Sequence, residues 1–195
     1  MPATHMLAGA LIGAALAAVT AAPLPLLVAA GMAGGVFPDL DIVHAHRRGL
    51  HYPVLYGVLA VAIGGAVVLT GSGAAVLTGV LAAWTHSVMD IFAGAELRSW
   101  DRSEWRDKAV YDHLRQSWMR PHRLVYGGSF RDAAISLGIA IALFTALPTA
   151  LHTAIAAVLL LGLLHALLIR YVASHVPGHH PTWASVIQSL VRGRL

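Results

Sequence analysis

Carboxylate and imidazole side chains gather in one short stretch of this sequence, VFPDLDIVHAHRRGLHYP, at residues 36–53. Asp39 and Asp41 follow Pro38, which is expected to end or bend a helix, so both carboxylates should project from irregular backbone. Two acids at this spacing suit a hard or borderline divalent cation. The alternative interpretation is a solvated turn at a helix end, in which the two acids only face water.

The same stretch carries two further candidate ligands. His46 and His51 flank the pair Arg47 and Arg48, and His51 stands just before Pro53, where the next apolar run begins. Imidazole nitrogen is a common metal ligand, although a single loop histidine is more often solvated. These residues extend the candidate site from two acids to a mixed set of oxygen and nitrogen ligands.

A second pair lies in WTHSVMD, at residues 84–90. His86 and Asp90 are four residues apart, so a helix places both on one face, the spacing that a histidine and a carboxylate need to share a metal. They can instead form a hydrogen-bonded link between helices. His5, near the start of the first apolar run, is a further candidate.

The composition is that of a membrane protein. Of 195 residues, 57% are apolar and 11% are charged, whereas soluble domains have about a quarter charged. We interpret six apolar runs as helices, at residues 5–22, 24–37, 53–70, 74–92, 133–147 and 150–172. The second and fifth runs are short for a membrane span. Cysteine is absent, so a metal would need nitrogen and oxygen ligands. Nucleic-acid binding is not expected, because a few loop arginines are usual for membrane proteins.

Short turns rich in Pro and Gly, at 21–25, 69–73 and 146–149, predict three helical hairpins. All 13 Lys and Arg lie outside these turns, at 47, 48, 98–131, 170, 192 and 194. If six helices alternate, the positive-inside rule places these residues and both termini in the cytoplasm. The sequence thus predicts an all-α, multi-pass bundle of transmembrane helices that lies in the lipid bilayer of the cell membrane. The candidate ligands His5, Asp39, Asp41, His51, His86 and Asp90 then all meet at the cytoplasmic face.

Four parts follow from this reading. Residues 1–92 form a four-helix membrane part with the metal site, 93–132 a Trp- and Arg-rich cytoplasmic segment at the membrane interface, 133–172 a C-terminal transmembrane hairpin, and 173–195 a basic tail. Within the second part, Val110, Leu114 and Trp118 recur at helical spacing, which predicts a short amphipathic helix on the membrane surface.

The motif set resembles the YdjM-like family of inner-membrane proteins, described as membrane-bound metal-dependent hydrolases. The resemblance rests on the early His5, FPDLD, HRRGLH and THSVMD, and it covers about residues 1–95. It implies a small multi-pass helical protein with His5, Asp39, Asp41, His51, His86 and Asp90 as ligands, while His46 and Arg47 match less closely. Where the family usually has Thr-His-Ser, this chain has Leu50, His51 and Tyr52.

Together these observations predict a metal-dependent hydrolase with zinc or manganese as cofactor. The metal would activate water, with Asp41 or Asp90 as general base, and Arg47 or Arg48 would balance charge developing on the substrate. Because the site lies at headgroup depth, a lipid or other membrane-associated ester is the expected substrate. Two alternatives remain. The first is a non-enzymatic membrane protein in which a structural metal links the helices and which binds a partner, and the second is a cation transporter.

Overall fold

The computed structural model describes residues 1–43, 46–93 and 108–175. These residues are mostly helical, as predicted, and they include one short pair of strands. The elements are α1 (Pro2–Ala17), α2 (Leu24–Val36), the 3-10 helix η1 (Phe37–Val43), α3 (Pro53–Thr70), α4 (Ala74–Phe92), β1 (Tyr111–Asp112), β2 (Ser117–Trp118), α5 (Phe130–Ala146) and α6 (Thr149–His175). Of the predicted basic tail, residues 176–195 lie outside the described part of the chain.

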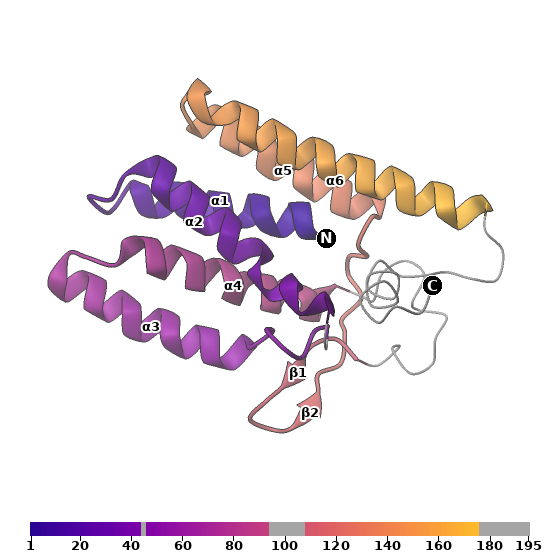
Figure 1. Ribbon diagram of the computed structural model, residues 1–195, viewed down its shortest axis with the longest axis horizontal. Coiled ribbons are helices and arrows are strands. Elements are labelled where there is room, and N and C mark those ends of the chain that lie inside the picture. Colours follow the sequence, from indigo (N-terminus) through magenta and orange to yellow (C-terminus); the bar gives the residue numbers. More distant parts are fainter. Residues whose placement is uncertain (44–45, 94–107, 176–195) are drawn as a thin grey trace.

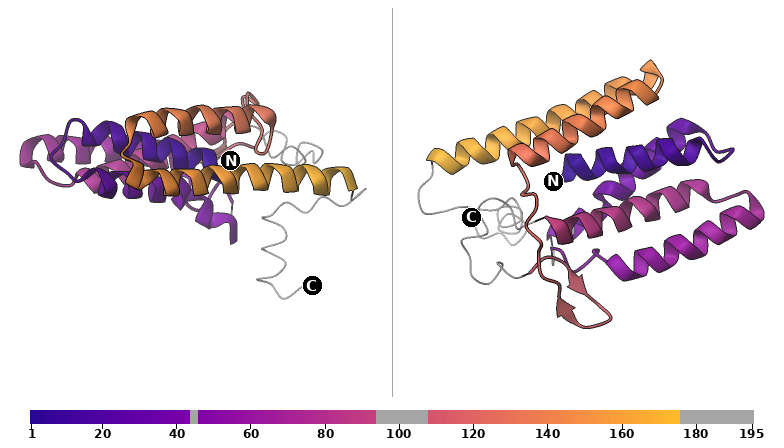
Figure 2. Two further views of the ribbon diagram at one scale, coloured as in Figure 1. Left: turned by 90° about the horizontal axis from the view of Figure 1, so that it is seen from above. Right: turned by 180° about the vertical axis from the view of Figure 1, so that it is seen from behind.

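The helices lie side by side and form a shallow layer (Figures 1 and 2). Consecutive helices pack in pairs, α1 on α2, α3 on α4 and α5 on α6, and α1 and α2 also pack on α4. The short connections within these pairs lie at one end of the layer, while the N terminus, η1 and the two strands lie at the other (Figure 1). We call this second end the polar end, since it brings together the start of α1, the end of α2 and the end of α4.

Four helical stretches are long and apolar enough to cross a membrane: Leu24–Ile42, Pro53–Thr70, Ala74–Phe92 and Thr149–Leu168. The second apolar run, predicted to be short, reaches this length because η1 continues α2 without a break. The first run gives a shorter helix of 16 residues, because α1 ends at Ala17. These lengths are consistent with a membrane protein.

Glycines set how closely the central helices approach. A Cβ atom at Gly9 of α1 would lie 1.9 Å from the Gly31 carbonyl oxygen of α2, and one at Gly31 would lie 1.9 Å from the Gly9 oxygen. Likewise a Cβ at Gly34 would lie 2.1 Å from the Gly79 oxygen of α4, and one at Gly35 would lie 2.3 Å from the His5 oxygen. Backbone meets backbone at these points, so larger side chains would force the helices apart.

Apolar packing joins α5 and α6 to α1 and α2. The buried cluster consists of Leu7, Ala10, Val28, Ala140, Leu143, Leu147, Ile155 and Val158. Most of the remaining large apolar side chains on α3 and α6 are exposed, among them Val61, Val68, Leu161 and Leu167. An exposed apolar face of this extent is expected where helices face lipid.

Hydrogen bonds also join α1 to α5 at the polar end. The Thr4 hydroxyl donates to Asp132 Oδ1 and lies 2.7 Å from Ser136 Oγ, while Asp132 Oδ2 accepts from the Gly128 N–H at 2.8 Å. The Ser129 hydroxyl accepts from the Asp132 N–H and so caps α5. We call Thr4, Asp132 and Ser136 the polar clasp; it fastens the start of α1 to the start of α5.

The predicted amphipathic helix at Val110, Leu114 and Trp118 is wrong. The segment is a β-hairpin in which Tyr111 pairs with Trp118 and Asp112 with Ser117. Asp112 Oδ1 accepts from the N–H groups of Leu114 and Arg115, which stabilises a turn rather than a helix. Val110 is fully buried whereas Leu114 is 76% exposed, so the two do not share one face. Residues 94–107 of the predicted interfacial segment lie outside the described residues.

Candidate metal centre

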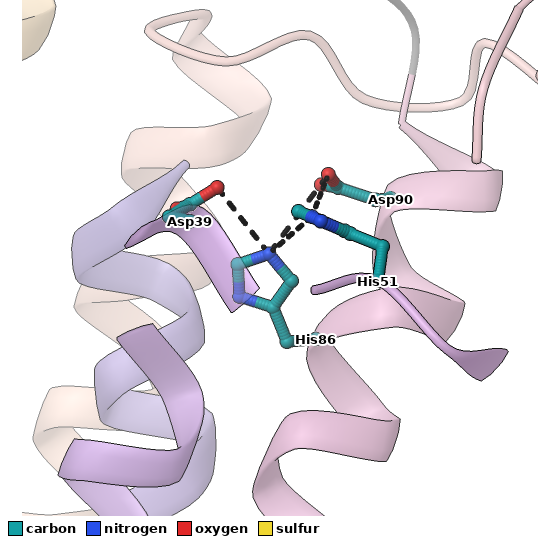
Figure 3. Close-up of side chains that lie close together, drawn as sticks. All are labelled: Asp39, His51, His86 and Asp90. Atoms are coloured by element: carbon teal, nitrogen blue, oxygen red, sulfur yellow. Dashed lines mark hydrogen bonds and ion pairs between the residues drawn. The ribbon is translucent and has the colours of Figure 1, made fainter. Parts of the chain in front are cut away.

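Four of the six predicted ligands come together at the polar end. Asp39, His51, His86 and Asp90 each offer one ligand atom, and these atoms all lie within 4.8 Å of one another. Asp39 comes from η1, His51 from the loop before α3, and His86 and Asp90 from α4. Figure 3 shows the four side chains converging on one point. We call these four residues the ligand cluster; it can hold a metal ion.

The backbone of α2 fixes the ring of His86. Its Nδ1 donates to the Gly35 carbonyl oxygen at 2.7 Å, so the lone pair is on Nε2. Nε2 faces His51 Nε2 at 3.2 Å, Asp39 Oδ1 at 3.4 Å and Asp90 Oδ2 at 3.9 Å. The close crossing of α2 by α1 at Gly35 therefore also places the atom that orients this imidazole.

Asp41 fixes the ring of His51 in the same way. Asp41 Oδ2 accepts from His51 Nδ1 at 2.9 Å and from the Leu50 N–H at 3.0 Å. Asp41 Oδ1 accepts from His46 Nδ1 at 3.1 Å and from the Arg47 N–H at 3.3 Å. A carboxylate behind a histidine that presents Nε2 is the usual support of a metal-binding imidazole.

The carboxylates around His51 also change its affinity for a proton. Burial alone would lower the pKa of the imidazole, but the hydrogen bonds to Asp41 and Asp90 overcome this and raise the pKa of His51 to about 9. The environment therefore favours a positive charge at the point where Nε2 of His51 meets the rest of the ligand cluster.

Three separations between ligand atoms match those around one small divalent ion, while that from His86 Nε2 to Asp90 Oδ2 is wider, at 3.9 Å. Ligands held tetrahedrally at about 2.0–2.1 Å from zinc lie about 3.3 Å from one another. The distances from His51 Nε2 to His86 Nε2 and to Asp90 Oδ2 are 3.2 and 3.4 Å, and the distance from His86 Nε2 to Asp39 Oδ1 is 3.4 Å.

A basic side chain lies against the ligand cluster. Arg47 Nε is 3.2 Å from Asp90 Oδ2, so the guanidinium offsets part of the carboxylate charge. Arg47 adopts a left-handed backbone with φ of 65°, and its carbonyl oxygen accepts from the Tyr111 N–H at 3.0 Å. Arg48 stacks over the Tyr111 ring at 4.3 Å. The hairpin thus holds the loop that carries Arg47 and His51.

Access to the cluster is uneven. The side chains of His51, His86 and Asp90 are at most 4% exposed, whereas that of Asp39 is 19% exposed. Beside Asp39 on η1, Phe37 and Leu40 are exposed apolar side chains. Asp39 is therefore the member of the ligand cluster most exposed to solvent, and exposed apolar side chains flank it.

The two other predicted ligands, His5 and Asp41, flank the cluster. His5 is buried, its ring centroid is 3.9 Å from that of His86, and its Nε2 is 3.6 Å from Asp90 Oδ1. Asp41 lies behind His51. The sequence interpretation missed the part played by Gly35; the signal for it is the spacing of Gly31 and Gly35, which repeats that of Gly9 and Gly13 and is typical of closely crossing helices.

Comparison of this chain with protein-family models, curated proteins and solved structures finds no match to any of the three. What can be inferred about its function therefore rests on the residues of the site.

Proposed function

We propose that this protein is a membrane-embedded, metal-dependent hydrolase with its site at the polar end. The observation that carries the proposal is the convergence of four ligand atoms on one point while both imidazoles are oriented from behind, His86 by the Gly35 carbonyl and His51 by Asp41. This set holds more buried acceptors than donors, a surplus that a bound cation would satisfy. The resemblance of the motifs to YdjM-like hydrolases agrees with this proposal.

In this proposal Asp39, His51, His86 and Asp90 hold a divalent cation, zinc or manganese. Such a cation would act as a Lewis acid, which lowers the pKa of bound water and polarises a phosphoryl or acyl oxygen. Arg47 keeps Asp90 in place and offsets its charge.

The general base is assigned to the second oxygen of Asp39, Oδ2, because Oδ1 faces the ligand cluster, rather than to Asp41 or Asp90. Asp39 has the most exposed carboxylate of the ligand cluster, so it is best placed to accept a proton from an attacking water. Asp41 already accepts four hydrogen bonds from the 46–51 loop, which makes it a positioning residue for His51.

A lipid or other membrane-associated phosphate ester is the proposed substrate class. The ligand cluster is near the ends of the candidate spans Leu24–Ile42 and Ala74–Phe92, at the same end of the layer as the strands (Figure 1), and in a bilayer such span ends would lie at the depth of lipid headgroups. Exposed Phe37 and Leu40 beside Asp39 would lie against acyl chains. By the positive-inside rule this face is cytoplasmic in the cell membrane.

The first test is metal content of the detergent-purified protein, compared between wild type, His86→Ala and Asp39→Ala. We expect stoichiometric metal in the wild type and its loss in both variants. The control is His152→Ala, which should keep the metal, because His152 lies on α6 and donates to the Leu147 carbonyl oxygen. Wild-type protein should then hydrolyse phospholipids or phosphate esters, lose activity on chelation and regain it when zinc or manganese returns. No metal after reconstitution, or no recovery of activity, would contradict the proposal.

A metal-stapled protein without enzyme activity is the second candidate. It is favoured by the number of protein ligands, since four ligands from three segments can close the coordination of a structural zinc. This candidate predicts that wild-type protein binds the metal but hydrolyses none of the esters tested. It also predicts that Asp39→Ala lowers stability rather than activity alone.

A further inference from the structure

His5 is a buried side chain with unused donor and acceptor capacity. Only 3% of it is exposed, and neither Nδ1 nor Nε2 makes a hydrogen bond. Buried polar groups in folded proteins almost always have a partner, because leaving one unpaired costs free energy. The arrangement of His5 therefore needs an explanation beyond packing.

The ring of His5 lies against the ligand cluster. It packs against the ring of His86 at a tilt, with 3.9 Å between centroids and 49° between the planes. Its Nε2 lies 3.6 Å from Asp90 Oδ1, which is longer than a hydrogen bond. This ring contact gives the ring carbons neighbours, but it leaves both nitrogens without a hydrogen bond.

The two oxygens of Asp90 face different partners. Oδ2 points to His51 Nε2 at 3.4 Å and to Arg47 Nε at 3.2 Å, on the side of the ligand cluster. Oδ1 is the oxygen nearest to His5. A carboxylate whose oxygens point to two separate ligand groups is the geometry of a bridge between two metal ions, which in hydrolytic sites lie about 3.5–4 Å apart.

We propose that His5 Nε2 and Asp90 Oδ1 hold a second divalent cation, of the zinc or manganese class, beside the one bound by the ligand cluster. Asp90 would bridge the two cations, and solvent or substrate oxygens would complete the coordination of the second cation. This inference rests on the proposed metal centre and extends it from one ion to a pair. A distance of 3.6 Å between the two ligand atoms suits a common ion, because neighbouring ligands of a small divalent ion lie about 3.3 Å apart.

The position of His5 is compatible with this role. Its carbonyl oxygen lies against Gly35 of α2, so its backbone is held at the helix crossing, and Thr4 beside it belongs to the polar clasp. The histidine is therefore fixed at the edge of the cluster by contacts on both sides. A preformed ligand of this kind loses little freedom when an ion binds.

The test uses the full-length protein in detergent, loaded with manganese and freed of excess metal. We expect about two ions per chain and an electron paramagnetic resonance spectrum of an exchange-coupled pair, as for carboxylate-bridged sites. His5→Ala and the more conservative His5→Gln should each bind about one ion and give an uncoupled spectrum. His152→Ala, the matched histidine control, should behave as wild type.

The possible outcomes separate this inference from the proposed function. A coupled spectrum in the wild type supports the pair even if a His5 variant fails to fold. Binding of about one ion by wild type and by His5→Ala alike, with loss in His86→Ala, overturns the second site and leaves the first standing. Absence of bound manganese and zinc in the wild type overturns both.

Discussion

Two buried polar clusters lie at the polar end, and they differ in how their atoms are satisfied. In the polar clasp, hydroxyl and N–H donors meet the oxygens of Asp132, so the group is complete without a ligand. In the ligand cluster, by contrast, three acceptors, His86 Nε2, Asp39 Oδ1 and Asp90 Oδ2, share two donors, His51 Nε2 and Arg47 Nε. A surplus of acceptors favours a cation between them, whereas matched donors and acceptors need nothing. The comparison separates a structural cluster from a binding site on chemical grounds.

The largest effect is expected from Gly35→Ala, which should damage both clusters. The new Cβ would lie 2.3 Å from the His5 oxygen, a backbone atom that cannot rotate away, so α1 must move off α2. Overpacking of this kind costs about 1–3 kcal/mol or more, and the shift also disturbs the carbonyl that orients His86. Thermal unfolding and metal titration should both show losses.

Gly65→Ala is the matched control, because a Cβ there meets nothing within 4 Å on α3. It should leave metal binding unchanged, and helix propensity favours it by up to about 1 kcal/mol. Equal losses in the two variants would mean that the close crossing at Gly35 does not matter.

Asp41→Asn should affect the ligand cluster alone. The amide keeps the shape of the carboxylate but holds the imidazole of His51 less firmly, and loss of such a supporting group typically costs about 10–100-fold in metal affinity. Competition with a chromophoric chelator measures this change. Complete loss of binding, equal to that of His86→Ala, would instead make Asp41 a direct ligand, as the sequence resemblance implies.

Asp132→Ala should affect the polar clasp alone. The Thr4 hydroxyl and the Gly128 N–H both lose the carboxylate that accepts from them, and the loss of a buried acceptor costs about 1–3 kcal/mol. The unfolding temperature in detergent should fall while the metal content stays at the wild-type value. The unfolding temperature of Asp132→Asn, which keeps an acceptor oxygen, should fall less. Loss of metal from folded Asp132→Ala protein would show that the two clusters are not independent.

The ligand cluster alone should also show a dependence of metal affinity on pH. With its pKa raised to about 9, His51 carries a proton at neutral pH, and the cation must displace it. Affinity should therefore rise about tenfold per pH unit up to about pH 9 and level off above it. Calorimetry in buffers of different ionisation enthalpy should record proton release, and release that is the same at pH 7 and above pH 9 would contradict this assignment.

The residue types and helix-end positions in the sequence were enough to predict Asp39, His51, His86 and Asp90 as neighbours, because helical spacing and the ends of apolar runs are local signals. The separate position of Asp41 was not predictable, since it depends on η1, in which two acids two residues apart point to different partners. The polar clasp left no sequence signal, because Thr4 and Asp132 are 128 positions apart. The β-hairpin was mistaken for a helix because its apolar spacing fits both.

The glycine contacts of α2 also bear on how the protein would respond to bilayers of different thickness. Gly31 and Gly35 join α2 to α1, and Gly34 joins it to α4, so the helices that carry His5, Asp39, His86 and Asp90 are locked into one rigid unit. Hydrophobic mismatch is then expected to be relieved by tilting of helices outside this unit, above all α3, which packs mainly on α4. The spacing of the ligand atoms of Asp39, His86 and Asp90 would stay constant from thin membranes to thick ones.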